Sequence, residues 1–184
     1  MGFISNEPTK IHRTKVLVVG ESCVGKTSML SVVTKDASQF PKNYNMTVGV
    51  ELRSKQFHIP GSAEVVELLF IDSSGNALYQ ELLKKSWPHD CLLCLTYDIT
   101  NKQSFQKLSF WLEAVQAHVK KGKPGLLLAN KADLSSRRFV TTSMGKEFAE
   151  KHKLIYFECS AKENVDLHEA FKSLALEWSK QQAH

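Results

Sequence analysis

The chain alternates between short, continuous apolar runs and longer stretches in which apolar residues recur every three or four positions. The run TKVLVVG at 14–20 is β-branched and ends in glycine, which is typical of a strand buried on both faces of a parallel sheet. Further apolar runs predict strands over 91–98, 125–130 and 154–160. The helical spacing predicts helices over 26–34, 104–121, 142–152 and 166–181.

Residues 50–59 and 65–72 differ, because the first of these segments alternates between apolar and polar positions. Pro60-Gly61 lies between them, so the pair predicts a β-hairpin, followed by a helix near 77–86. Beyond the hairpin, strand and helix alternate, as in a doubly wound α/β domain. We therefore predict a six-stranded, mostly parallel sheet with one antiparallel edge strand and about five helices. Such sheets bind ligands at the carboxyl ends of their strands.

The length of 184 residues fits one domain, which we place at 14–181, with a flexible N-terminal tail at 1–13 and a C-terminal tail at 182–184. The net charge of +5, from 24 Lys and Arg against 19 Asp and Glu, suits an anionic ligand, although a solvated basic surface is the commoner cause. The sequence shows no membrane-spanning run, secretory leader or lipid-attachment motif. We therefore expect a cytoplasmic protein without a direct lipid anchor.

Cys91 and Cys94 form a Cys-x-x-Cys pair, a spacing found in redox and zinc sites. They lie inside an apolar run that predicts a strand, where residues three apart point to opposite faces. No second pair of Cys or His follows at ligand spacing. Packing in the core is therefore the favoured interpretation, and it is typical of a reducing compartment.

The segment GESCVGKT at 20–27 matches the pattern Gly-x4-Gly-Lys-Ser/Thr and lies between a predicted strand and a predicted helix. In this phosphate-binding loop the backbone N–H groups face a phosphate, Lys26 reaches the outer phosphates, and the Thr27 hydroxyl is offered to Mg²⁺. The chance alternative is a glycine-rich turn, which the flanking elements disfavour. The candidate nucleotide-binding residues here are Glu21, Ser22, Cys23, Val24, Gly25, Lys26, Thr27 and Ser28.

Asp72 ends the second strand of the hairpin, and Gly75 follows three residues later. Next to a phosphate-binding loop, Asp72 would hold Mg²⁺ through water in its shell, and the Gly75 N–H would approach a terminal phosphate. An Asp-x-x-Gly segment alone is weak, since it is usually only a turn. Its place after the phosphate loop makes it a candidate site.

Two more polar segments, NKAD at 130–133 and CSAK at 159–162, end the last two predicted strands. Asp133 can accept hydrogen bonds from both the ring N–H and the amino group of guanine, a donor pair that adenine lacks. Asn130 would join its loop to the phosphate loop, and the stem of Lys131 would cover the base. In the second segment the Ala161 N–H would reach the guanine oxygen, between Ser160 and Lys162. Each segment alone is weak, and a strand-closing turn is the alternative.

Together, GESCVGKT, DSSG, NKAD and CSAK resemble the motifs of the small Ras-like GTPases, which are P-loop NTPases, and MTVGVE at 46–51 resembles the first switch of the Rab branch. The resemblance covers about 14–180. It implies binding of GTP or GDP with Mg²⁺, with Thr47 as a ligand of Mg²⁺ and the terminal phosphate. It also implies Phe40 packed against the guanine and Tyr44 over the phosphates. The alternatives are Phe40 in the core, and Tyr44 and Thr47 as loop residues.

Within that branch, FPKNYNMTVGVEL, IPGSAEVVEL and the segment from 69 to 105 resemble the Rab-like GTPase subunit of intraflagellar transport complex B. This resemblance implies a place in ciliary or flagellar transport, at the cilium and basal body. It further implies a small β-sandwich subunit and coiled-coil subunits as partners. A conventional Rab-like role in vesicle traffic is the alternative.

The sequence departs from ordinary Rab proteins at positions that matter for activity and recognition. Leu52 and Ile71 replace aromatic residues that partners read, and Ser74 replaces the usual alanine. Asn76 stands where a glutamine orients the attacking water, and its amide is one methylene shorter. A misplacement of that order costs about 10²-fold in rate, so we expect weak hydrolysis. Two hypotheses follow: a slowly cycling GTPase, in which Asn76, Thr47 and Lys26 would serve catalysis, or a scaffold that keeps GTP bound.

Overall fold

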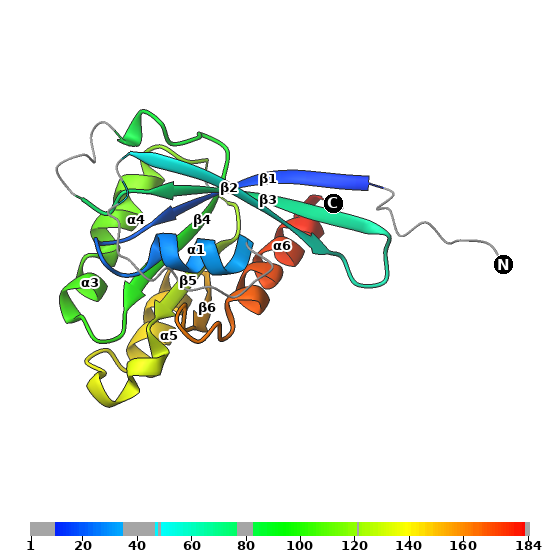
Figure 1. The fold of residues 1–184 in the computed structure, drawn as a ribbon. Helices are drawn as coiled ribbons and strands as arrows, with labels where there is room; N and C mark the ends of the chain where they lie inside the picture. Colours follow the sequence, from blue (N-terminus) through cyan, green and yellow to red (C-terminus); the bar gives the residue numbers. More distant parts are fainter. Residues whose placement is uncertain (1–9, 35–46, 48, 77–82, 121, 183–184) are drawn as a thin grey trace.

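A sheet of six strands crosses the molecule in the order β2-β3-β1-β4-β5-β6 (Figure 1). The computed structural model describes residues 10–34, 47, 49–76, 83–120 and 122–182. β2 runs antiparallel to β3, and every other pairing is parallel, so the predicted fold class is confirmed. The strands are β1 Lys10–Val19, β2 Val50–His58, β3 Glu64–Ser73, β4 Leu92–Asp98, β5 Gly125–Asn130 and β6 Leu154–Glu158.

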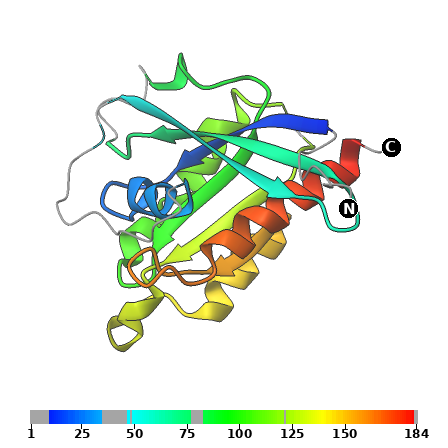
Figure 2. The same ribbon diagram turned by 45° about the vertical axis from the view of Figure 1, so that its right-hand side comes forward.

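Helices cover both faces of the sheet (Figures 1 and 2). α1 and α6 contribute buried side chains to one apolar cluster, and α4 and α5 contribute to the other. In the described ranges the helices are α1 Lys26–Thr34, α3 Lys102–Gln106, α4 Leu108–Gln116, the 3-10 helix η2 Ala132–Arg137, α5 Thr142–Lys151 and α6 Leu167–Gln182. None of these is long and apolar enough to cross a membrane.

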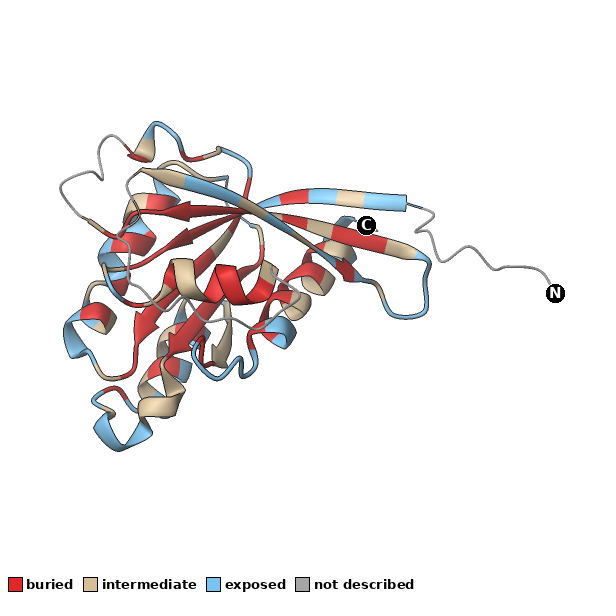
Figure 3. Cartoon of the chain, viewed as in Figure 1, coloured by how far each residue is buried: buried red, intermediate tan, exposed pale blue. Residues whose placement is uncertain are grey.

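The continuous apolar run of β1 contributes buried side chains to both faces of the sheet. Val16 and Val18 pack into the cluster beneath α1 and α6, while Leu17 and Val19 pack into the cluster beneath α4. All four side chains are fully buried, and Figure 3 shows β1 as buried where it runs between the helices and as exposed at its other end. Burial on both faces explains why this strand shows no alternation in its sequence.

The predicted helix over 104–121 is two helices. The Asn101 side chain accepts a hydrogen bond from the Ser104 N–H, so the first helix begins at Lys102. Lys107, at φ −82° and ψ −1°, separates α3 from α4, and α4 ends at Gln116. The helical spacing of the apolar residues continues through this interruption, so the sequence alone predicts one element.

β1 begins at Lys10, four residues before the strand expected from 14. Apart from Ile11 the added residues are polar, and their pairing with β3 supplies the stabilisation. His12 Nε2 and Glu64 Oε2 are 2.8 Å apart, and Arg13 Nε donates to Glu67 Oε2 at 2.7 Å. The ends of β1, β2 and β3 therefore extend beyond the helices as a three-stranded projection (Figures 1 and 2).

The Cys-x-x-Cys pair is confirmed as core packing. Cys94 lies in the cluster beneath α1 and α6, and Cys91 lies in the cluster on the opposite face. None of the four cysteines is in a disulfide. The described part of the chain contains no group of three His, Cys, Asp or Glu side chains that could hold a metal ion.

Candidate nucleotide site

The carboxyl ends of β1, β3, β5 and β6 meet at one edge of the sheet, and each leads into one of the four polar segments. The parallel register explains this convergence, since Val18 of β1 pairs with Asp72 of β3. Segments more than 100 residues apart in sequence are therefore neighbours. The site is built where a doubly wound sheet normally binds its ligand.

The loop between β1 and α1 turns tightly, and glycine is required near both of its ends. A Cβ on Gly20, which has φ +149°, would lie 2.2 Å from the Thr96 carbonyl oxygen. Gly25 has φ +98°, and a Cβ there would lie 2.4 Å from Nδ2 of Asn130. Cys23 has φ 65°, in the left-handed region that non-glycine residues seldom adopt. The loop then enters α1, whose N-terminus carries the positive end of the helix dipole. This arrangement suits a phosphate.

Lys26 is buried at the base of this loop, with 6% of its surface exposed. Its ammonium donates to the carbonyl oxygens of Gly20 at 2.8 Å and Glu21 at 2.9 Å. Burial lowers the pKa of Lys26 to about 8, and the nearby Asp72 carboxylate opposes that shift. A polyanionic ligand would favour the charged form of this ammonium.

Thr27, Thr47 and Asp72 form a cluster of oxygen atoms beside Lys26. The Thr27 hydroxyl donates to Asp72 Oδ2 at 2.5 Å and lies 2.7 Å from the Thr47 hydroxyl. Asp72 is fully buried, and its Oδ1 has no hydrogen-bond partner among the described residues. Burial raises the pKa of Asp72, against the hydrogen bond from Thr27 and the charge of Lys26. Two hydroxyls and a carboxylate with an unsatisfied oxygen fit Mg²⁺, which prefers oxygen ligands.

Gly75 lies directly against the phosphate loop. A Cβ on Gly75 would be 2.5 Å from the Glu21 carbonyl carbon and 2.5 Å from the Ser22 nitrogen. Only glycine allows these two backbones to approach so closely. The Asp-x-x-Gly turn and the phosphate loop thus meet at the peptide between Glu21 and Ser22.

Asn130 joins three loops through its side-chain amide. Its Nδ2 donates to the Val24 carbonyl at 2.8 Å, and its Oδ1 accepts from the Ala161 N–H at 3.1 Å. Asn130 is 1% exposed, so both bonds are sheltered from water. The phosphate loop and the two segments predicted to contact the base are therefore held in fixed positions.

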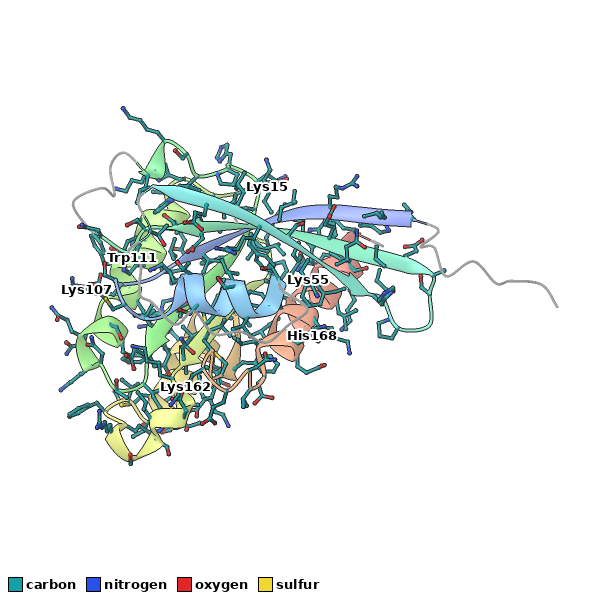
Figure 4. The ribbon with its side chains drawn as sticks, in the orientation of Figure 1. Lys15, Lys55, Lys107, Trp111, Lys162 and His168 are labelled. Atoms are coloured by element: carbon teal, nitrogen blue, oxygen red, sulfur yellow. The ribbon has the colours of Figure 1, made fainter. Side chains whose placement is uncertain are left out.

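The two base-contacting segments are also joined directly, because the Ser160 hydroxyl donates to Asp133 Oδ1 at 2.7 Å. This bond orients the Asp133 carboxylate. Each oxygen of a carboxylate can accept more than one hydrogen bond, so Asp133 can also accept from a ligand. Lys131 has φ 67°, and its ammonium pairs with Asp98 Oδ2 at 2.6 Å. Lys162, the last residue of the CSAK segment, is exposed and is labelled in Figure 4.

A pocket of about 540 Å³ adjoins the phosphate loop at Cys23 and Val24, and Lys131 of the NKAD segment also lines it. Its opposite wall comes from residues at the end of β4 and the start of α3, together with Phe139.

Three expected residues need separate mention. Phe40 and Tyr44 lie outside the described residues. Asn76 is half-buried just after Gly75, and its backbone N–H donates to the Ser74 hydroxyl at 3.3 Å.

The two departures from the Rab aromatic surface lie side by side, because Leu52 of β2 pairs with Ile71 of β3. Leu52 is 76% exposed, whereas Ile71 is buried. At this pair the exposed side chain is therefore the aliphatic Leu52, where ordinary Rab proteins carry an aromatic residue.

The side chains that support these loops do not belong to any of the four motifs. Lys107 and Trp111 contact the Glu21 carboxylate, and Arg138 contacts Glu158, which immediately precedes the CSAK segment. Lys107 and Trp111 are 86 and 90 residues from Glu21 in the sequence, so no short sequence motif predicts these contacts. Arg138 and Glu158 could have been suspected only after η2 and β6 had been placed side by side.

The fold and the order of the four loops define a P-loop nucleotide-binding protein, and the model of the Ras family matches residues 15–180. The chain therefore belongs to the Ras family, as its motifs suggested.

Its curated relatives extend over nearly the whole chain. The intraflagellar transport protein 27 homolog of Bos taurus is 38% identical over 162 residues, covering 88% of this chain and 87% of that protein. The intraflagellar transport protein 27 homolog of Trypanosoma brucei brucei is 31% identical, covering 89% and 88%. Ras-related protein Rab-10 of Diplobatis ommata is 32% identical, covering 88% and 78%. The resemblance to the Rab-like branch is confirmed.

Proposed function

We propose that this protein binds GTP and GDP together with Mg²⁺. The observation that carries the proposal is the buried cluster beside Lys26, in which Asp72 presents an unsatisfied carboxylate oxygen next to the hydroxyls of Thr27 and Thr47. A buried carboxylate of this kind is costly unless a cation compensates it. Thr27, Thr47 and Asp72 would hold Mg²⁺, which would supply positive charge against the phosphates. Lys26 would hold the outer phosphates.

We propose guanine as the base. Asp133 is oriented by Ser160, and the Ala161 N–H is fixed by Asn130. A carboxylate pairs with the two adjacent donors of guanine, and a base without them would leave the carboxylate unpaired. The same loops therefore supply both affinity and discrimination.

Hydrolysis should be weak. The glutamine that orients the attacking water in related GTPases is Asn76 here, and its shorter side chain places the amide short of that water. Intrinsic hydrolysis is on the order of 10⁻⁴ per second even with glutamine. A scaffold subunit that retains GTP is the second candidate, and Asn76 is the observation that favours it.

We also propose that the protein is a subunit of the intraflagellar transport machinery. The support is its similarity, over almost its full length, to intraflagellar transport protein 27 homologs of two distant organisms. The aliphatic pair at Leu52 and Ile71 fits a partner set that differs from that of ordinary Rab proteins. The family resemblance points to a small β-sandwich subunit and coiled-coil subunits as partners, at the cilium or flagellum. Restored transport in ciliated cells that lack their own homolog would test this role, and failure of expressed, folded protein to restore it would contradict the role.

Nucleotide competition tests the site itself. Purified protein stripped of nucleotide should bind GTP and GDP at least about 100-fold more tightly than ATP. Asp133→Asn should reverse the preference toward xanthine nucleotides, because its amide donates to the xanthine 2-carbonyl and no longer accepts from the guanine amino group. Asp90→Asn, at an exposed carboxylate, is the matched control and should change nothing. Equal binding of ATP and GTP would overturn the guanine proposal.

A further inference from the structure

The carboxylate of Glu21 ties the phosphate loop to the junction between α3 and α4. Lys107 Nζ lies 2.9 Å from Glu21 Oε2, and Trp111 Nε1 donates to Glu21 Oε1 at 3.1 Å. The Glu21 side chain is 18% exposed and the Trp111 indole is fully buried. Figure 4 labels Lys107 and Trp111 where the loop after β1 passes α4. Each carboxylate oxygen has its own donor, so the orientation of the carboxylate is fixed.

The helix interruption described above provides these donors. Lys107 closes α3 and precedes α4, and its carbonyl accepts from the Trp111 N–H at 3.1 Å. The two donors are therefore one helical turn apart on a common element. The Glu21 carboxylate is therefore held by the side chains of Lys107 and Trp111.

The backbone of Glu21 contacts both groups assigned to the outer phosphates. Its carbonyl accepts from the Lys26 ammonium at 2.9 Å, and its peptide with Ser22 lies against Gly75. The base-contacting loops are attached elsewhere, through Asn130 at the Val24 carbonyl. A shift of Glu21 would therefore displace the groups for the outer phosphates while leaving the base contacts in place.

We infer that Lys107 and Trp111 are positioning residues that, through Glu21, set the preference of the site for GTP over GDP. Lys26 serves both outer phosphates, but Gly75 faces only the terminal one. Loosening the peptide between Glu21 and Ser22 therefore weakens the contact that GDP does not make. This inference rests on the proposed nucleotide site.

The test compares the dissociation constants of a non-hydrolysable GTP analogue and of GDP in wild type, Lys107→Met and Glu21→Gln. Lys107→Met keeps the aliphatic stem but removes the charged donor, and Glu21→Gln removes the carboxylate charge. In each variant the affinity for the GTP analogue should fall by roughly tenfold relative to that for GDP, as expected for one weakened charge-assisted hydrogen bond. Lys107→Arg keeps a cationic donor and should restore most of the preference.

A spectroscopic readout separates positioning from a general loss of stability. The chain has three tryptophans, so Trp111 is observed alone in the Trp87→Phe/Trp178→Phe background. Its emission should differ between the GTP-analogue and GDP complexes, and Lys107→Met should abolish most of that difference. Arg13→Met, which breaks the Arg13–Glu67 pair far from the loop, is the control and should leave the affinity ratio and the emission difference unchanged.

The outcomes distinguish this inference from the proposed function. An unchanged affinity ratio in Lys107→Met and Glu21→Gln, with both nucleotides still bound, would overturn the positioning role alone. If wild type bound neither GTP nor GDP, the proposed function would fail and the inference with it.

Discussion

At the scale of single residues, Asp72 is the most informative side chain of the site. It is fully buried, it uses one oxygen to accept from Thr27, and its other oxygen has no partner among the described residues. Burial raises its pKa, which shows how poorly the folded protein alone accommodates the charge. These features support our proposal that the Asp72 carboxylate serves a cation rather than stability.

Asp72→Asn should therefore uncouple Mg²⁺ from nucleotide binding. In wild type with GDP, replacing EDTA by Mg²⁺ should raise the free energy of unfolding, by about 2.7 kcal/mol when the ion is at 100 times its dissociation constant. The variant should lose that increase, although its stability without ligands should be equal or higher because a buried charge is gone. Thermal unfolding measures both quantities. A Mg²⁺-dependent increase that persists in the variant would show that Asp72 is not part of the metal site, and Asp90→Asn is the control.

The four thiols should differ sharply in reactivity. Burial raises the pKa of Cys91 to about 11 and that of Cys94 to about 12, and it raises the pKa of Cys159 as well. Cys23 is exposed on the phosphate loop. At pH 7.5 iodoacetamide should therefore modify Cys23 alone in the folded protein, and GDP with Mg²⁺ should slow that reaction. Mass spectrometry of tryptic peptides checks the pattern; protection of Cys23 by ATP but not by GDP would contradict the site.

At the scale of elements, the NKAD and CSAK segments, which we propose contact the base, are supported by the Glu158 carboxylate. Glu158, the last residue of β6, accepts two hydrogen bonds from Arg138, at 2.9 and 2.7 Å, just after η2. It also accepts from Thr142 at 2.6 Å and Tyr156 at 2.9 Å. This cluster fixes the end of β6 against the end of η2, so it sets the separation of the NKAD and CSAK segments.

The stability that Glu158 contributes should depend on pH. Burial opposes its ionisation, but the hydrogen bonds from Arg138, Thr142 and Tyr156 outweigh burial and lower its pKa below the ordinary 4.5. Its contribution is therefore complete above pH 4.5 and is lost as the pH falls through the lowered folded-state pKa. At pH 7, Glu158→Gln should lower the free energy of unfolding by about 2 kcal/mol.

Urea unfolding at a series of pH values measures this difference between wild type and variant. The difference should shrink as the pH falls below 4.5. Glu67→Gln removes the carboxylate of an ion pair with a solvent-exposed arginine and should cost less than about 1 kcal/mol. A cost for Glu158→Gln that does not change with pH would show that the neutral network, rather than the charge, provides the stability.

The elements themselves were largely predictable from the chain. Continuous apolar runs such as 125–130 gave strands with the correct bounds, because burial on both faces excludes polar residues. The interruption at Lys107 was not predictable, since the apolar spacing continues across it. The start of β1, which is polar apart from Ile11, was also missed, because cross-strand partners such as Glu64 stabilise it.

The candidate site likewise has one part that the sequence predicts and another that it does not. Its contacting residues come from short motifs, so their places at the strand ends follow from the sequence. The supports of those residues do not: Trp111 meets Glu21 across 90 residues, and Ser160 meets Asp133 across 27. Such pairs emerge only when the sheet brings its strand ends together.

At the scale of the whole molecule, all four loops gather at one edge of the sheet, while the ends of β1, β2 and β3 project from the opposite edge (Figure 1). We propose that the edge with the loops binds a guanine nucleotide with Mg²⁺. Asn76 is the position at which we expect the chain to differ from a competent hydrolase. Our central claim is therefore that the protein holds GTP firmly and cleaves it slowly.

Single-turnover hydrolysis of bound GTP, in wild type and in Asn76→Gln, tests that claim most directly. We predict a wild-type rate constant below the order of 10⁻⁴ per second. The variant should be faster, by up to about 10²-fold if its longer amide reaches the attacking water. Equal nucleotide affinities in the two proteins would confine the difference to the chemical step. A wild-type chain that cleaves GTP as fast as Asn76→Gln would contradict the account.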